Sequence, residues 1–220
     1  NFTDDSKDYL QGIFDTILNK DIARRLNIAD TVSLENVTKF LLHSIGNKIS
    51  PTKIANTLKS AGKSVDQKTV DKYIKGLVDS MLIYEAGRYN IKGKQFLSTQ
   101  SKYYVVDVGM RNALVKSSES DIGHILENIV YLELKRRYKN VYVGEIDSGE
   151  VDFVSVNDNK YEYYQVSATT LDENTLKREL APFGKIKDNY PKYLLTLDDV
   201  FSNADYNGVQ KINVLEWLLK

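Results

Sequence analysis

Cysteine is absent from this 220-residue sequence, and there are only two histidines and one tryptophan. Without cysteine the chain forms no disulfide, no thiolate metal site and no cysteine nucleophile. His43 and His124 are too few and too far apart for a zinc cluster, and each is predicted to lie at the edge of a helix's apolar face. Trp217 is predicted to pack a terminal helix onto a sheet rather than to bind a ligand.

Long apolar runs are also missing. No run approaches the ~18 residues that span a bilayer, and no apolar segment follows a basic start as in a signal peptide. The 42% of hydrophobic residues is ordinary for a globular protein of one large or two small domains. We therefore expect a cytoplasmic protein that does not associate with membranes. The first residue is Asn1 rather than methionine, which predicts a fragment of a longer chain or a processed chain.

Neither sign of charge is in excess, since 30 basic residues balance 30 acidic ones, but the two signs are unevenly distributed. Residues 31–102 hold 12 Lys and Arg against 5 acidic residues, a net charge of +7, whereas residues 121–220 hold 12 against 17, a net charge of −5. This asymmetry predicts a basic half that binds a partner and an acidic half that holds cations. The alternative is a solvated surface with no such role.

The first half has the pattern of a winged helix, predicted over residues 31–116. Apolar residues at helical spacing predict helices over 8–30 and 33–45 and after Ser50-Pro51, and a capping box at Ser64 to Gln67 predicts the start of another. Short β-rich pieces at 82–86, 87–91 and 102–106 would form the wing. A small helical bundle with a docking hairpin is the alternative. The residues predicted to face DNA are Lys68, Thr69, Lys72, Tyr73 and Lys75 on the helix, with Arg88 and Lys92 on the wing.

The second half, residues 121–220, is predicted to be an α/β sandwich with a mixed sheet. Its pattern predicts a helix at 121–138, strands at 140–146, 150–156 and 161–167, a helix at 172–188, a strand at 192–197, and a strand and helix at 209–219. The polar stretch from Lys116 to Ser120 is the predicted domain boundary.

Four residues of this half form a recognisable constellation. Glu127 lies among apolar residues of a predicted helix, Asp152 on one strand of a hairpin, and Gln165 and Ser167 on the other strand, where both point to one face. The arrangement resembles the restriction-endonuclease-like PD-(D/E)XK core. In that fold, the resemblance implies, Glu127, Asp152 and Gln165 bind Mg²⁺, while Ser167 stands where a catalytic lysine steadies the attacking water.

The two differences from that motif weaken its chemistry. Glutamine removes one negative charge from the metal site, and serine carries no positive charge; losing a charged transition-state stabiliser costs roughly 3 kcal/mol. A basic group from elsewhere would have to substitute, and the candidates are Lys135, Lys177 and Arg178.

Longer motifs resemble the C-terminal region of bacterial AAA-type ATPases of the domain-of-unknown-function family 4143. They are the stretches 126–134, 150–154, 165–167 and 188–193, in that order. This resemblance implies that residues 1–30 are a helical linker from an ATPase module outside this sequence. No ATP site is expected here, because Ala61-Gly62-Lys63-Ser64 has Thr57 where a phosphate-binding loop needs its first glycine.

The function expected from these features is binding of nucleic acid, DNA in particular, or of a partner protein, beside a degenerate nuclease-like site. One alternative is a weak Mg²⁺-dependent nuclease that uses Glu127, Asp152 and Gln165. The other is a module that only docks proteins.

Overall fold

The computed structural model describes residues 4–116, 121–147, 149–158 and 160–220. It is a mixed α/β structure whose eight strands form one sheet in the order β2-β1-β3-β4-β5-β6-β8-β7, which confirms the predicted α/β class. The chain divides into two compact units, one of residues 1–85 and 100–118 and the other of residues 86–99 and 119–220. The predicted boundary at 117–120 lies outside the described residues.

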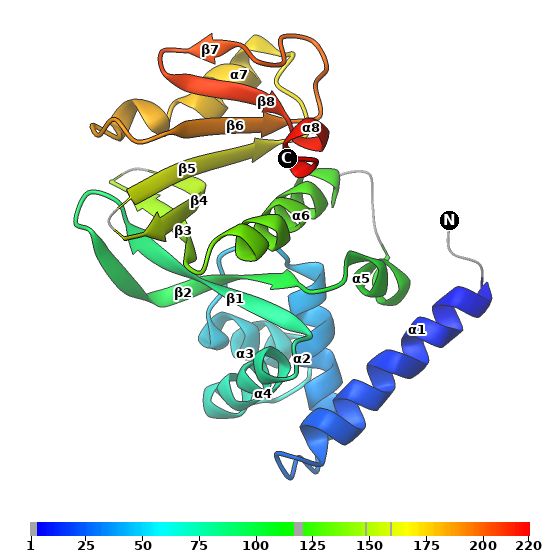
Figure 1. Ribbon diagram of the computed structural model, residues 1–220. Helices are drawn as coiled ribbons and strands as arrows, with labels where there is room; N and C mark the ends of the chain where they lie inside the picture. Colours follow the sequence, from blue (N-terminus) through cyan, green and yellow to red (C-terminus); the bar gives the residue numbers. More distant parts are fainter. Residues whose placement is uncertain (1–3, 117–120, 148, 159) are drawn as a thin grey trace. The chain divides into compact units, whose positions relative to one another are not determined.

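The first unit is mostly helical (Figure 1). Polar side chains start its helices: Asp30, Ser50 and Asp66 each accept a hydrogen bond from the backbone N–H three residues later. The predicted capping box at Ser64 is therefore wrong, because Asp66 caps that helix. The elements are α1 (Asp4–Thr16), the π-helix η1 (Ile17–Ala23), α2 (Thr31–His43), α3 (Pro51–Ser60), α4 (Gln67–Asp79) and α5 (Val108–Leu114).

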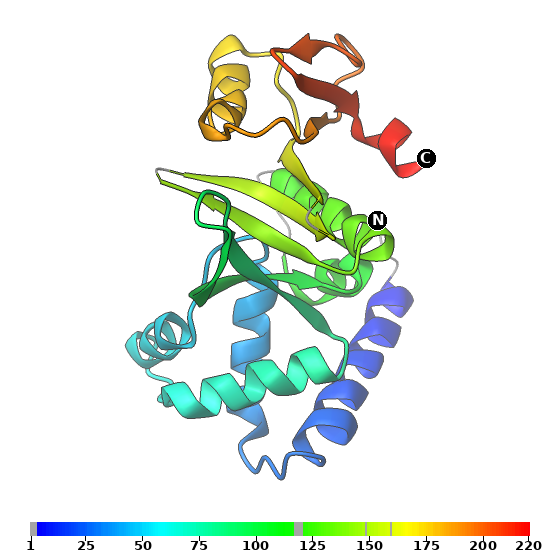
Figure 2. The same cartoon turned by 60° about the vertical axis from the view of Figure 1, so that its left-hand side comes forward.

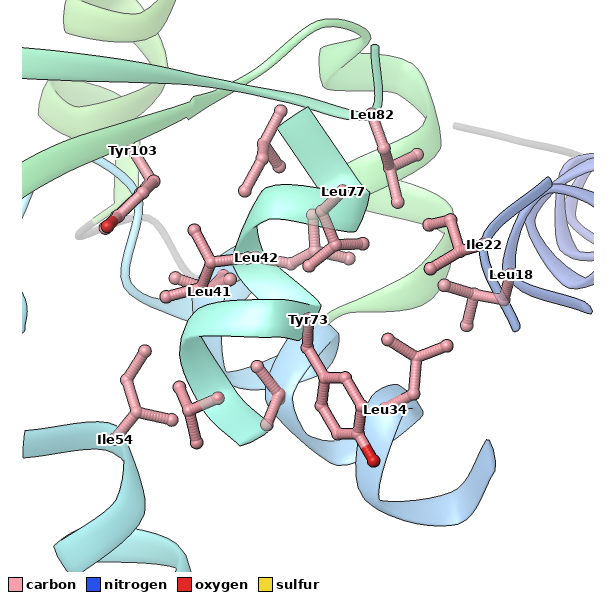
Figure 3. Packing of buried hydrophobic residues seen from close by; sticks show 14 of the residues in the cluster. Leu18, Ile22, Leu34, Leu41, Leu42, Ile54, Tyr73, Leu77, Leu82 and Tyr103 are labelled. Carbon is pink, nitrogen blue, oxygen red and sulfur yellow. The ribbon is translucent and has the colours of Figure 1, made fainter. Parts of the chain in front are cut away.

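Figure 3 shows how the apolar faces of these helices form one core. Leu34 of α2 and Leu77 of α4 are fully buried, and Ile22 of η1 packs in the same cluster. The segment predicted as a helical linker, residues 1–30, therefore contributes side chains to this core. The prediction that Tyr73 faces DNA is wrong, because this residue is buried and its hydroxyl donates to the backbone oxygen of Asp30 at 3.4 Å.

The second unit contains most of the sheet. Its elements follow the sequence pattern closely, with three corrections: the segments 82–86 and 87–91 form one strand, β1; the strand predicted over 102–106 begins at Gln95; and the helix predicted over 172–188 ends at Leu180 because Pro182 follows. The strands of the sheet are β1 (Ile83–Asn90), β2 (Gln95–Val105), β3 (Val141–Ile146), β4 (Gly149–Asn157), β5 (Lys160–Ser167), β6 (Lys192–Thr196), β7 (Asp205–Tyr206) and β8 (Val209–Asn213). Strands β1 and β2 are divided between the units, since residues 83–85 and 100–105 belong to the first. The helices are α6 (Ile122–Arg137), α7 (Glu173–Leu180), η3 (Phe183–Lys185) and α8 (Val214–Leu218).

The directions of the strands bring the ends of several strands together in this unit. Strand β1 runs parallel to β3, while β4 is antiparallel to both β3 and β5. The ends of β1, β3 and β5 and the start of β4 therefore share one edge of the sheet, which we call the site edge. Helices α6 and α7 both contact β5 and lie on opposite sides of it (Figures 1 and 2).

Candidate functional site

The four residues of the predicted nuclease-like constellation line one cavity at the site edge. The cavity has a volume of about 480 Å³, and Glu127, Asp152, Gln165 and Ser167 all contribute to its wall. Helix α6 supplies the glutamate, β4 the aspartate and β5 the last two. The antiparallel pairing of Phe153 with Tyr164 brings Asp152 beside Gln165. Tertiary structure thus gathers residues that lie up to 40 positions apart in the sequence.

Asp152 and Gln165 are held in place by reciprocal hydrogen bonds between β4 and β5. The backbone N–H of Val166 donates to Asp152 Oδ2 at 2.9 Å, and the backbone N–H of Asp152 donates to Gln165 Oε1 at 3.2 Å. Both side chains are buried, with 8% of each residue's surface exposed. The two polar groups are therefore oriented by the backbone of the neighbouring strand, as a binding site requires.

A third carboxylate, Glu179, enters the cavity from α7. Gln165 Nε2 donates to Glu179 Oε2 at 2.8 Å, so the glutamine amide joins β5 to the helix. With its carbonyl oxygen accepting from the backbone N–H of Asp152 and its amide donating to the Glu179 carboxylate, Gln165 connects the backbone of β4 to α7. Its predicted role as a metal ligand would use the remaining lone pair of that carbonyl oxygen.

Sequence reasoning did not identify Glu179, although a signal for it was present. It follows three residues after Leu176, whose side chain packs in the apolar core, and helical residues three apart share a face. A carboxylate there has to lie at the edge of the buried face. Only the fold shows that this edge borders the cavity.

Among the described residues that line the cavity, Arg178 is the one arginine, and no lysine is present. Its Nε and Nη2 both donate to Glu179 Oε1, at 3.1 and 2.8 Å. Of the other two cations proposed to replace the missing lysine, Lys177 forms an ion pair with Glu173 at 2.6 Å, and Lys135 donates to the backbone oxygen of Lys139. Neither of those two is among the residues that line the cavity.

Glu127 lies one helical turn after His124, which also lines the cavity. His124 Nδ1 and Glu127 Oε2 are 3.9 Å apart, close enough for an ion pair when the imidazole is protonated. The prediction for His124 gave it only a place at the edge of a helix face. The structure adds a position beside a cavity carboxylate.

Ser167 has a local role in the strand end. Its hydroxyl donates to the backbone oxygen of Thr169 at 2.9 Å, which stabilises the turn that leaves β5. Ala168 and Thr169 of this turn also line the cavity. Serine therefore helps to shape the wall but brings no positive charge to it.

A buried ion pair stabilises the same turn. Asp198 Oδ2 accepts hydrogen bonds from the backbone N–H of Thr170 at 2.8 Å and from Lys211 Nζ at 2.9 Å. The side chains of Lys211 and Asp198 are 2% and 3% exposed. Burial opposes ionisation of Asp198, but hydrogen bonds from Thr169, Lys211 and Thr170 outweigh it and lower its pKa to about 2.

The groups that line the cavity determine whether a divalent cation can bind there. Among the residues that the structure describes, no group of three or more His, Asp or Glu is placed to hold a metal ion by itself. Mg²⁺ commonly keeps several waters and takes one or two carboxylates together with substrate phosphates. The cavity therefore suits an ion only where water and phosphate complete its coordination.

The residues predicted to bind DNA fall into two groups. Lys68, Lys72 and Lys75 are exposed on α4 at helical spacing, so they share one face of the first unit. Arg88 and Lys92 belong instead to the second unit, where Arg88 pairs with Glu145 and Lys92 with Asp147, each at 2.9 Å. The predicted wing is thus part of the large sheet, and both of its cations are paired with carboxylates.

Comparison with known proteins identifies a family and two relatives of this chain. Residues 1–121 match the family described as domain of unknown function DUF8612. An uncharacterised protein of Haemophilus influenzae is 39% identical over 96% of this chain and 52% of its own length, and the uncharacterised protein MJ1544 of Methanocaldococcus jannaschii is 34% identical over 94% and 45%. The chain thus spans about half the length of these relatives.

These matches correct one expectation. The resemblance to AAA-type ATPases of family 4143 is wrong, because the matching family is DUF8612 and the names of both relatives mention no ATPase. The crystal structure of protein VC1899 from Vibrio cholerae is 10% identical over 94% of this chain and 53% of that chain, with a TM-score of 0.28, which is too low to support an inference. None of the described helices has the length and hydropathy of a membrane span.

Proposed function

Because the chain belongs to the DUF8612 family, whose description names no activity, we propose its function from the cavity of the second unit: a weakened nuclease-like site that cleaves phosphodiester bonds of nucleic acid with the help of a divalent cation. A single observation carries the proposal. Three carboxylates from separate elements, Glu127, Asp152 and Glu179, line one cavity together with Arg178.

The charge of the cavity favours this chemistry. Its charged lining residues are three carboxylates and one guanidinium, so the net charge is −2 when all are ionised and His124 is neutral. One divalent cation would neutralise that charge. Without a cation, an anionic phosphate would be repelled from the cavity, because like charges at close range cost several kcal/mol.

The roles of the residues follow from how each is held. Asp152 and Glu127 would bind the ion together with water and phosphate, and Glu179 would add negative charge to the cavity. Mg²⁺ or Mn²⁺ supplies Lewis-acid polarisation of the scissile phosphate when it is bound. Arg178, whose side chain is 72% exposed, can reach a bound phosphate and stabilise its negative charge.

Reduced activity is part of the proposal. Arg178 is paired with Glu179, so only part of its charge is available to a phosphate. Losing a charged transition-state stabiliser costs roughly 3 kcal/mol, or about a hundredfold in rate. We expect cleavage to be slow rather than absent.

The first unit supports the same substrate class through α3 and α4, which we interpret as a helix-turn-helix of winged-helix type. Lys68, Lys72 and Lys75 form its exposed basic face. Such a face binds phosphates independently of base sequence. The second unit would accordingly be a restriction-endonuclease-like domain.

Metal binding tests the proposal through Glu179. Mn²⁺ is titrated by calorimetry into the intact chain, and cleavage of labelled DNA and RNA is followed in parallel. Glu179→Gln removes one cavity carboxylate and should weaken Mn²⁺ binding at least tenfold. Glu173→Gln is the matched control, because it lies on the same helix but outside the cavity, and it should bind Mn²⁺ like the parent. No Mn²⁺ binding by the parent, or the same affinity in Glu179→Gln, would refute the proposed function.

A further inference from the structure

A second, larger cavity lies at the site edge of the same unit. Its volume is about 630 Å³, and it is formed by the turn after β1, the end of β3 and residues 184–188 after α7. This volume is within the ~300–1,000 Å³ typical of small-molecule sites. Its chemistry is opposite to that of the carboxylate cavity.

The floor of this cavity is apolar. Ile91, Ile146 and Ile186 contribute to its lining, and each belongs to the buried core of the unit with 5–8% of its surface exposed. Because the three residues come from separate segments that all pack into one core, the floor is a fixed surface. It suits the flat, weakly polar body of a ligand.

The rim is basic. Four lysines line it, Lys92, Lys94, Lys185 and Lys187, against the two carboxylates of Asp147 and Asp188, so the net charge is +2. Asp147 accepts from Lys92 at 2.9 Å. The Asp188 carboxylate accepts from the Tyr163 hydroxyl at 2.7 Å and from the backbone N–H of Tyr190 at 3.2 Å. Both carboxylates are thus engaged within the protein, and the lysines of the rim outnumber them by two.

An aromatic ring beneath the rim contacts one of its lysines. Lys94 Nζ lies 5.6 Å from the centre of the Tyr161 ring, and that ring packs edge-on against Tyr190 at 5.1 Å. A cation stacked on an aromatic ring is favourable and orients the ammonium group. One lysine of the rim is therefore positioned by the core.

We propose that this cavity is a binding site for a nucleoside phosphate, with the base and sugar on the isoleucine floor and the phosphate held by the lysines. A purely inorganic anion would use the rim and leave the floor uncovered. A purely apolar ligand would leave the excess positive charge uncompensated. A nucleoside phosphate uses both surfaces.

Two sources can supply this chemistry, a free nucleotide or the phosphorylated end of a nucleic-acid strand. Asp147 of this cavity and Asp152 of the carboxylate cavity are five residues apart, which spans at most about 17 Å. A strand bound at one cavity can therefore reach the other. The nucleotide site itself does not depend on the proposed nuclease activity, because the two cavities are lined by different residues.

The test measures binding of AMP, inorganic phosphate and a 5′-phosphorylated oligothymidylate to the intact chain by calorimetry, without divalent cations. Lys185→Glu combined with Lys187→Glu should weaken binding of AMP or of the oligonucleotide at least tenfold. Lys139→Glu combined with Lys160→Glu makes the same charge change on exposed lysines next to the starts of β3 and β5, at the opposite edge of the sheet. This control should leave the affinity within about twofold.

Each outcome either supports or overturns the inference. Saturable binding of AMP that is lost only in the cavity variant supports a free nucleotide, and the same result for the oligonucleotide alone supports a strand end. Equal losses in both double variants would show general charge attraction and overturn the inference. So would phosphate binding as tight as AMP binding, or no binding of any probe. None of these results depends on Mn²⁺, so a failure of the nuclease proposal is separately visible.

Discussion

Gln165→Glu tests the geometry of the carboxylate cavity most directly, because the change is isosteric and alters one contact. Gln165 Nε2 now donates to Glu179 Oε2 at 2.8 Å. In the variant an oxygen replaces that nitrogen, and an attractive hydrogen bond becomes a contact between two carboxylates. The acceptor that receives the Asp152 N–H is retained.

The cost follows from Coulomb's law and is limited by protonation. Two unit charges 2.8 Å apart repel by about 6 kcal/mol at an effective dielectric constant of ~20, and by about 4 kcal/mol at ~4 Å. The pair can instead bind a proton, which from a usual glutamate pKa near 4.3 costs about 3.7 kcal/mol at pH 7. We therefore expect the variant to lose about 3–4 kcal/mol of stability at pH 7.

The pH dependence has a definite sign. Because the folded pair has a raised pKa, its protonated form is favoured, so the penalty is small near pH 4 and grows as the pH rises toward 7. Millimolar Mn²⁺ should restore much of the loss, since a cation between the carboxylates replaces the proton. Urea unfolding at pH 4.5 and pH 7, with and without Mn²⁺, measures both effects, and Gln95→Glu at an exposed position is the control. A variant as stable as the parent at pH 7 would refute the contact between Gln165 and Glu179.

Three further predictions address other parts of the chain. Lys211→Met leaves Asp198 buried without its cation, so the variant should lose about 3–5 kcal/mol of stability in urea unfolding, and a loss below 1 kcal/mol would contradict the buried pair. In the parent, Asp198 should contribute about 2 kcal/mol of stability above pH ~4, and this contribution should be lost as the pH falls toward its pKa of about 2. Lys72→Glu should weaken DNA binding across sequences alike and lower the slope of log affinity against log salt by about 1, whereas salt-insensitive binding would exclude phosphate contacts. Proteolysis between Lys116 and Ser120 should leave two fragments that elute together on size exclusion, because residues 88–90 pair with β3 across the cut, and fragments that separate without denaturant would disprove that pairing.

Local chemistry was sufficient to predict most elements. Alternating Val, Tyr and Phe residues around a polar turn specified the hairpin of β4 and β5, and the helical periodicity of residues 121–138 specified α6 to within a residue. Local signals failed where two competed. Ser64 and Asp66 both suit a helix N-cap, and in the structure Asp66 starts α4, whose residue Val70 is buried in the core.

The hairpin β1–β2 shows why the domain organisation could not be predicted from the sequence. Its sequence is compatible with a wing, since short β-rich pieces with turn residues carry no record of their partner strand. In the structure residues 88–90 pair with β3, more than 50 residues further along the chain, and Arg88 and Lys92 pair with Glu145 and Asp147. Cross-strand pairing is a long-range choice, so no local pattern could reveal it.

For the candidate site, the sequence by itself determined the chemical types and their order: a helix glutamate, a strand aspartate, and a glutamine and serine two residues apart on one face of the next strand. Side-chain alternation and helical periodicity are local properties, and they fixed these four positions. Only the tertiary structure brought Glu179 and Arg178 into the same cavity, because the contact of α7 with β5 is made by folding and is not a local property of either segment. It also placed the Gln165 amide between the backbone N–H of Asp152 and the Glu179 carboxylate, because hydrogen-bond partners depend on distances that the sequence does not contain.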